Sequence, residues 1–188
     1  TLPESSPRQR FAVEVDRRIA EMLAERLRGE TQVSVVCQDI LTFPWSDFTE
    51  VTVIGAIPYH ITSPILVALC EARAVIGKAV LIVQKEVGER LLAHPGSKAY
   101  GRLSVLVQYG WRVSRLSAVP RSAFYPQPDV ESLCVELVRQ EPLPVQVERE
   151  VVFFELVKAA FGQRRKTLAN CLRATPSFGL SRAAAEAL

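Results

Sequence analysis

Residues 51–66, VTVIGAIPYHITSPIL, constrain the fold of this chain more than any other segment. An apolar run stops at Gly55, a Pro58-Tyr59 pair and a polar turn follow, and Pro64 opens a second apolar run. The pattern predicts a buried strand that ends in a stiff loop, because proline fixes its own φ and restricts the residue before it. Ligands of open α/β sheets bind at the carboxyl ends of strands, so this loop would present the Tyr59 ring for stacking on a flat ligand. A plain strand–turn–helix junction is the alternative.

Apolar periodicity predicts strands that alternate with helices over most of the chain. We expect strands at 10–15, 33–36, 51–54, 79–83, 103–109, 113–116 and 133–138, and helices at 17–28, 64–73, 85–94 and 149–161. This order is typical of an α/β fold with a mostly parallel sheet and helices on both faces. The last strands follow one another without a helix, so the sheet should close with an antiparallel pair.

The pattern changes after residue 140, where Pro142 and Pro144 precede a helical stretch and a basic run. We therefore expect two domains, an α/β domain over residues 1–140 and a small helical domain over residues 141–188. A chain of 188 residues can bury one sizeable core.

The composition of the chain indicates in which cellular compartment the protein is expected. No apolar run approaches the roughly 18 residues of a membrane span, and no signal peptide is visible. The four cysteines are too far apart for a paired metal motif and too few for a disulfide scaffold. We expect a cytoplasmic, monomeric protein that holds no metal and uses its cysteines as core filler.

Charge is distributed unevenly. The whole chain carries a net charge of +3, yet residues 73–121 contain nine Lys or Arg against Glu86 and Glu89 only. A one-sided basic surface attracts polyanions such as RNA. A solvated face of long basic side chains is the alternative.

Two acids follow the first two expected strands. Glu14, at the tip of one strand, could accept hydrogen bonds from both hydroxyls of a ribose, and Asp39, after the next, from an adenine amine. Helix capping is the alternative role for each. A nucleotide site of this architecture also has a Gly-rich loop after its first strand. We expect that strand and loop to be missing from the sequence, because TLPESSPRQR leads directly into the strand of Glu14.

Three further segments are candidates for contact with a nucleic acid. Prolines stiffen the segment AFYPQPDVES, where Phe124 could form a second face of a base sandwich or a plain core contact. Lys98 and Arg102 lie in a long, basic, Gly-containing connection, and the run QRRKTL places Arg164, Arg165 and Lys166 after a helix. These cations suit RNA phosphates or, equally, a solvated surface.

The segments VEVDRRIAEML, QDIL, GAIPYHITSPIL, VQKEVGERLLAHPGSKAYGRLSVLVQY, AFYPQPDVES and AFGQRRKTLAN resemble the small-subunit rRNA adenine N6,N6-dimethyltransferases of the KsgA or RsmA type. These enzymes are related to the erythromycin-resistance rRNA methyltransferases. The resemblance runs from Phe11 to about Leu172 and implies a Rossmann-like class I methyltransferase sheet with a small C-terminal helical domain that binds rRNA.

The resemblance implies an enzyme of ribosome biogenesis that uses S-adenosyl-L-methionine to methylate N6 of two adjacent adenosines near the 3′ end of small-subunit rRNA. It implies that Glu14 holds the cofactor ribose and Asp39 its adenine, with Gln38 beside it. The segment Ala56-Ile57-Pro58-Tyr59 stands where the family has Asn-Leu-Pro-Tyr. In the family the Asn side chain and the next carbonyl accept from the target amine while Tyr stacks on the base, and Phe124 would stack from the other side. Such transfer requires neither a covalent intermediate nor a metal.

Ala56 departs from the family, because a methyl group cannot accept a hydrogen bond. This favours a second hypothesis, a catalytically weak rRNA-binding assembly factor of the small subunit. A third is a resistance-type methyltransferase that acts on large-subunit rRNA.

Overall fold

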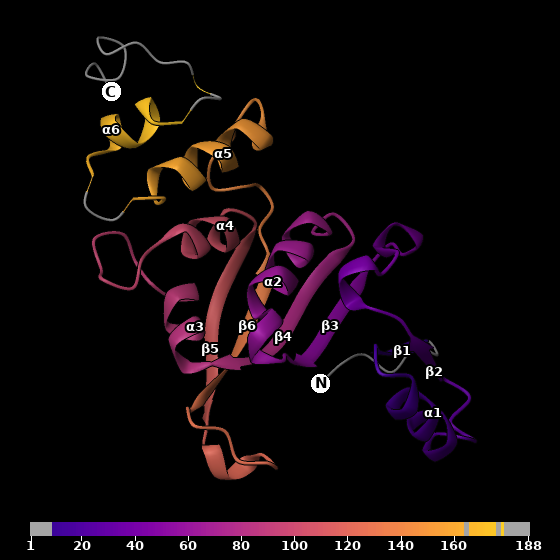
Figure 1. Cartoon of the computed structure of the whole chain (residues 1–188). Helices are drawn as coiled ribbons and strands as arrows, with labels where there is room; N and C mark the ends of the chain where they lie inside the picture. Colours follow the sequence, from indigo (N-terminus) through magenta and orange to yellow (C-terminus); the bar gives the residue numbers. More distant parts are fainter. Residues whose placement is uncertain (1–8, 164–165, 176–177, 179–188) are drawn as a thin grey trace. The chain divides into compact units, whose positions relative to one another are not determined.

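The structure, a computed structural model, describes residues 9–163, 166–175 and 178. The chain divides into two compact units, Thr1–Asp47 and Phe48–Leu188. Figure 1 shows the elements along the chain. Each unit is an α/β arrangement in its own right.

The first unit is a strand–helix–strand unit. β1 (Arg10–Glu14) and β2 (Val33–Cys37) pair in parallel, with Glu14 opposite Cys37, and α1 (Arg17–Arg26) connects them. Two short 3-10 turns follow, η1 (Ile40–Thr42) and η2 (Trp45–Asp47). The strands predicted at 10–15 and 33–36 and the helix predicted at 17–28 are thereby confirmed.

The second unit is built on a four-stranded sheet in the order β3-β4-β6-β5. Its strands are β3 (Val51–Ala56), β4 (Ile76–Gln84), β5 (Trp111–Val119) and β6 (Ser132–Arg139). β3 and β4 are parallel, whereas β6 is antiparallel to both β4 and β5. The predicted antiparallel ending is confirmed, but this sheet is mixed rather than mostly parallel.

Three helices cover one face of this sheet. They are α2 (Thr62–Glu71), α3 (Lys85–Leu91) and α4 (Arg102–Gly110), and α4 contacts both of the others (Figure 1). Strand residues that alternate along β4 and β6 point into the core, and the fully buried side chains include Leu66, Val83, Val107, Trp111 and Leu137. On β3, by contrast, Ile54 is 80% exposed, so no element of the described part of this unit covers its side chain.

β5 lies at one edge of the sheet and is exposed along most of its length. Its pairing with β6 is interrupted by a register shift between Arg115 and Ser117. A short turn, η4 (Arg121–Ala123), begins the loop that leads from β5 into β6.

α5 (Glu150–Ala160) and α6 (Leu168–Arg173) form the C-terminal part of the second unit. They contact each other, and α5 also packs on α4 through the rings of Phe153 and Phe154, whose centroids lie 5.0 and 5.4 Å from that of Tyr109. The helix predicted at 149–161 is confirmed.

The strand predicted at residues 103–109 is wrong, because these residues belong to α4. Val105 and Val107 suggest a strand by type, yet the buried positions Ser104 and Val107 recur at helical spacing. Ser104 also stabilises the helix start, since its Oγ accepts from the Gly101 backbone N–H at 3.1 Å and donates to the Arg90 carbonyl at 2.6 Å.

The cysteines are free, as expected, but they are not all core filler. Cys70 and Cys171 are buried, whereas Cys37 is exposed at the end of β2. Burial raises the pKa of the Cys70 thiol to about 12. No helix in the described part of the chain is long and apolar enough to cross a membrane.

Candidate active site

The loop after β3 is fixed by hydrogen bonds at both of its ends. The backbone N–H of Ile57 donates to the Ile82 carbonyl at 3.0 Å, and the Ile57 side chain is buried. At the other end, the hydroxyl of buried Thr62 lies 3.2 Å from the carbonyls of both Pro58 and Tyr59. These hydrogen bonds support the sequence prediction of a stiff loop, which stays a prediction. Ala56, the last residue of β3, is exposed.

The ring of Tyr59 is half-buried and is tied down at its far end. Its hydroxyl lies 2.8 Å from the Oγ of Ser132, the first residue of β6. The backbone of Tyr59 belongs to η3 (Tyr59–Ile61), which leads directly into α2. Tyr59 is thus held both through its backbone and through its phenol.

Phe124 is half-buried in the loop between β5 and β6. The loop is braced by Arg121, whose Nη1 donates to the Asp129 carbonyl at 3.2 Å. At its end, Lys85 Nζ contacts Glu131 Oε2 at 2.8 Å, and this ammonium lowers the pKa of the Glu131 carboxyl.

The Tyr59 loop and the Phe124 loop lie at the same edge of the sheet. Ala56 is opposite Ile82 near the carboxyl end of β4, and Gln84, two residues further on, is opposite Ser132. Ser132 is also opposite Val119, the last residue of β5. The register therefore places both loops beyond the carboxyl ends of β3 and β4, at the lower edge of this sheet in Figure 1.

The predicted cofactor residues Glu14, Gln38 and Asp39 gather at one edge of the first unit. The Gln38 backbone N–H donates to the Glu14 carbonyl at 3.0 Å, and the Gln38 amide donates to the Thr42 carbonyl at 2.9 Å. Each acid uses one oxygen locally, since Glu14 Oε1 accepts from the Asp16 N–H and Asp39 Oδ1 from the Leu41 N–H, both at 2.9 Å. Within the described residues the second oxygen of each acid has no partner.

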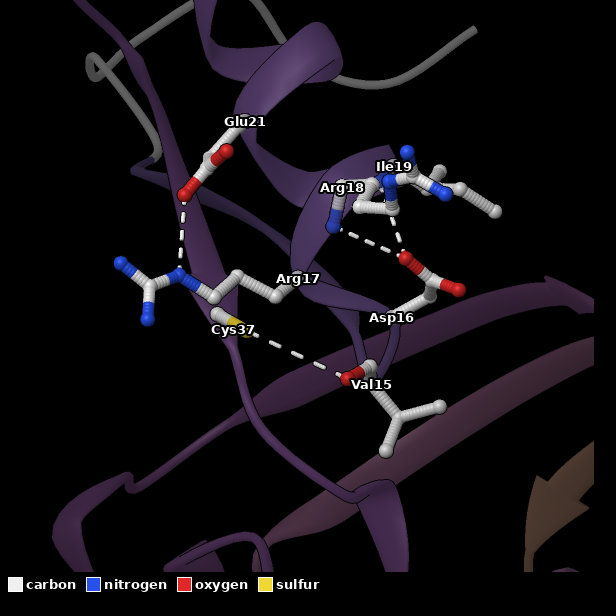
Figure 2. Close-up of polar contacts among 7 residues, drawn as sticks. All are labelled: Val15, Asp16, Arg17, Arg18, Ile19, Glu21 and Cys37. Carbon is white, nitrogen blue, oxygen red and sulfur yellow. Dashed lines mark hydrogen bonds and ion pairs between the residues drawn. The ribbon is translucent and has the colours of Figure 1, made fainter.

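Asp16, two residues after Glu14, has a structural role that Figure 2 makes plain. Its carboxylate accepts from the backbone N–H groups of Arg18 and Ile19 at 2.8 and 3.2 Å, so it is the N-cap of α1. The same view shows the contact between Cys37 and Val15, in which the Cys37 Sγ lies 4.0 Å from the Val15 carbonyl oxygen. The turn that carries Glu14 is thereby tied to β2.

The predicted RNA-binding residues come from two segments that meet. Lys98 is exposed in the connection before α4, and Arg102 is exposed at the first position of α4. Between them, the Tyr100 ring packs edge-to-face on Phe161 at the end of α5, with centroids 6.2 Å apart. Lys166 is exposed a few residues after Phe161, whereas Arg164 and Arg165 lie outside the described residues.

Sequence reasoning missed a polar cluster that joins α5 to the rest of the unit. Glu150 forms an ion pair with Arg73 and accepts from the Tyr109 hydroxyl at 3.0 Å, while the Arg73 guanidinium lies 5.7 Å from the centre of the Tyr109 ring. Arg73 lowers the pKa of Glu150, and burial together with Glu150 raises the pKa of Tyr109. Tyr109 and Arg73 lie 41 and 77 positions from Glu150 in the chain, so no local sequence motif predicts the cluster.

Across the described part of the chain, no group of three or more His, Cys, Asp or Glu side chains is arranged to hold a metal ion.

Comparisons with known proteins agree on one family. The family model "Ribosomal RNA adenine dimethylase" matches residues 1–184. Proteins described as ribosomal RNA small subunit methyltransferase A from Bacillus thuringiensis and from Geobacillus are 40% and 37% identical over 169 residues, which is 86% of this chain. The chain spans 58% of the length of these relatives.

Two solved structures give the same result. A dimethyladenosine transferase from Plasmodium falciparum matches with a TM-score of 0.75 and 29% identity, over 89% of this chain and 60% of that one. The 23S rRNA methyltransferase ErmE matches with a TM-score of 0.70 and 28% identity, over 89% of this chain and 68% of that one.

Proposed function

The chain belongs to the ribosomal RNA adenine dimethylase family, and from this premise we propose that it transfers methyl groups to N6 of adenosines in small-subunit rRNA. The specific targets proposed are the two adjacent adenosines near the 3′ end. The observation that carries the proposal is the braced loop after β3, which holds Tyr59 beyond the carboxyl edge of the sheet. The small-subunit names of the relatives that are 37–40% identical support this target over the large subunit.

Glu14, Gln38 and Asp39 suit S-adenosylmethionine. Each acid keeps one carboxylate oxygen without a partner in the described residues, which fits acceptors for ribose hydroxyls at Glu14 and for an adenine amine at Asp39. When bound, the cofactor would supply a methyl group activated by its positively charged sulfur. The proposed residues only bind and orient it.

The proposed role of the Tyr59 loop is to hold and orient the target base. The N6 amine is a weak nucleophile because its lone pair is delocalised into the ring. If the Ile57 carbonyl accepts a hydrogen bond from this amine, the nitrogen is drawn toward a tetrahedral geometry that frees the lone pair. Stacking on Tyr59 and Phe124 would fix the ring, at a gain of roughly 1–3 kcal/mol per stacked base. The base must leave its own stack to enter such a site.

Ala56 removes one acceptor from this arrangement, and its replacement provides the main test. Ala56→Asn would restore the side-chain amide of the family pattern at an exposed strand end that can accommodate it. We expect transfer to rise about tenfold to a hundredfold, which corresponds to roughly 1.4–2.7 kcal/mol of transition-state stabilisation. Ala56→Leu, of similar size but without an acceptor, is the matched control and should show no gain.

The assay measures incorporation of labelled methyl groups by the full-length protein into small ribosomal subunits that lack this modification. Methylation that maps to adenosine N6 and rises only with Asn at position 56 supports the proposal. Incorporation into large subunits alone would instead indicate a resistance-type activity.

Ala56 itself favours a second candidate function, that of an rRNA-binding assembly factor with weak catalysis. Tight binding to small subunits without any incorporation, by both the wild type and Ala56→Asn, would support this function and reject the first.

RNA contact is proposed for the surface around the Tyr100–Phe161 pair. Lys98, Arg102 and Lys166 are exposed cations on the two segments that this ring contact joins, and they suit phosphate groups. Arg164 and Arg165 belong to the same proposal by sequence. We assign the methyltransferase function to residues 1–140 and part of the rRNA contact to residues 141–188.

A further inference from the structure

The structure contains a buried hydroxyl group at the far end of the Tyr59 ring, next to the phenol oxygen. Ser132 is 0% exposed, and its Oγ lies 2.8 Å from the Tyr59 hydroxyl. In the described part of the chain no other polar group bonds to this Oγ. A fully buried side-chain hydroxyl therefore depends on a single partner, and that partner is the aromatic residue on which base stacking is proposed.

This dependence restrains the ring. If Tyr59 rotated away from the sheet, Ser132 would be left as a buried hydroxyl without a hydrogen bond, which is unfavourable. The backbone of Tyr59 is already held by Thr62. The ring is consequently fixed at both ends before any base arrives, and such preorganisation lowers the ordering cost of binding.

Ser132 also connects Tyr59 to the second aromatic residue. It is the first residue of β6, and it pairs with Gln84 on one side and with Val119 on the other. The loop that carries Phe124 begins just after Val119 and ends at Ser132. A hydrogen bond to Ser132 therefore ties the Tyr59 ring to the base of the Phe124 loop.

We propose that Ser132 is a positioning residue that fixes the ring of Tyr59, and its spacing from the Phe124 loop, for a purine that stacks there. The inference rests on the proposed function of the Tyr59 loop. Ser132 touches neither base nor cofactor in this proposal, and acts only through the Tyr59 hydroxyl.

The test uses the full-length protein and the variants Ser132→Ala, Tyr59→Phe and the double variant, with Ser117→Ala, at an exposed position of β5, as the matched control. The first readout is kcat/KM for methyl transfer to small subunits. The second is quenching of 2-aminopurine fluorescence in a short single-stranded RNA, which reports stacking without any transfer. Thermal unfolding of every variant checks the fold.

We expect Ser132→Ala and Tyr59→Phe each to lower kcat/KM about threefold to tenfold, the usual range for one neutral hydrogen bond. The double variant should be no worse than either single variant, because both remove the same bond. Quenching should fall in all three variants and stay unchanged in Ser117→Ala. A merely structural role of Ser132 would lower the unfolding temperature of the variants but leave kcat/KM and quenching of the folded variants unchanged.

Wild-type values in Ser132→Ala, or a double variant that combines two independent losses, would overturn the inference. If Ser132→Ala fails to fold, Tyr59→Phe decides, since unchanged transfer and quenching in that variant also overturn it. If the wild type transfers no methyl group, the proposed function is rejected. The quenching measurement alone then tests the inference about Ser132. Equal quenching in wild type and both single variants, or none in any, overturns the inference, whereas a loss confined to the variants supports it.

Discussion

Gly88→Ala should destabilise the second unit, although alanine is normally the better helix residue. Gly88 lies in α3 against β6, and a Cβ built on it would be 2.8 Å from Leu133 Cδ1 and 3.0 Å from Leu133 Cβ. The first contact could be relieved by a side-chain rotation, but the second could not, because a Cβ moves only with its backbone. Leu133 is 3% exposed and has little room to yield.

Two opposing contributions set the expected size of the effect. Alanine gains about 1 kcal/mol over glycine in a helix interior, whereas overpacking a close contact costs about 1–3 kcal/mol. Because the Cβ–Cβ contact is unavoidable, we expect the overpacking cost to dominate and the free energy of unfolding to fall by about 1–2 kcal/mol. For a chain of this size that corresponds to a drop in Tm of about 2–8 °C.

Urea unfolding followed by far-UV circular dichroism measures this change. Gly55→Ala is the matched control, because a Cβ at Gly55 meets nothing within 4 Å and should leave stability unchanged or slightly raised. A Gly88→Ala variant as stable as the wild type would refute the reasoning. Leu133 follows Ser132 directly, so a displaced β6 should also weaken methyl transfer.

Two further predictions concern ionisable groups. Arg73 lowers the pKa of Glu150, so the interaction stabilises the fold above the ordinary glutamate pKa of about 4.3 and is lost as the pH falls through the lowered value. Glu150→Gln should therefore reduce the free energy of unfolding at pH 7 by about 1–2 kcal/mol, a figure discounted for partial exposure. Urea titrations at several pH values should show that this deficit shrinks in acid. A deficit independent of pH would contradict the assignment. Buried Cys70, with its pKa raised to about 12, should resist iodoacetamide at pH 8, while exposed Cys37 should react. Peptide mass spectrometry measures the labelling of each cysteine. Equal labelling of the two would contradict the described burial.

Much of the architecture follows from local sequence signals. The strand at 51–54, its Pro58-Tyr59 loop and the helix after it combine an apolar run with proline and turn residues, which act over a few positions. Glu14 and Asp39 lie at the same edge of the first unit because parallel strands bring their carboxyl ends to one edge, a rule that needs no knowledge of packing.

The rest depends on contacts between distant positions. Residues 103–109 form a helix because Ser104 and Val107 are buried at helical spacing, which overrides the strand preference of valine. Ser132 lies 73 positions from Tyr59, and a lone serine at a strand start carries no signal that its hydroxyl supports an aromatic ring. The Arg73, Tyr109 and Glu150 cluster is hidden for the same reason.

The edge strand β5 has a consequence for the behaviour of the protein at high concentration. A long exposed strand offers unpaired backbone groups to which a second molecule could add its own strand. Here the exposed arginines at 112 and 115 and the irregular pairing after Arg115 make that edge charged and uneven. Two copies brought edge to edge would oppose like charges along a bent strand, so β5 should protect the protein against intermolecular sheet growth.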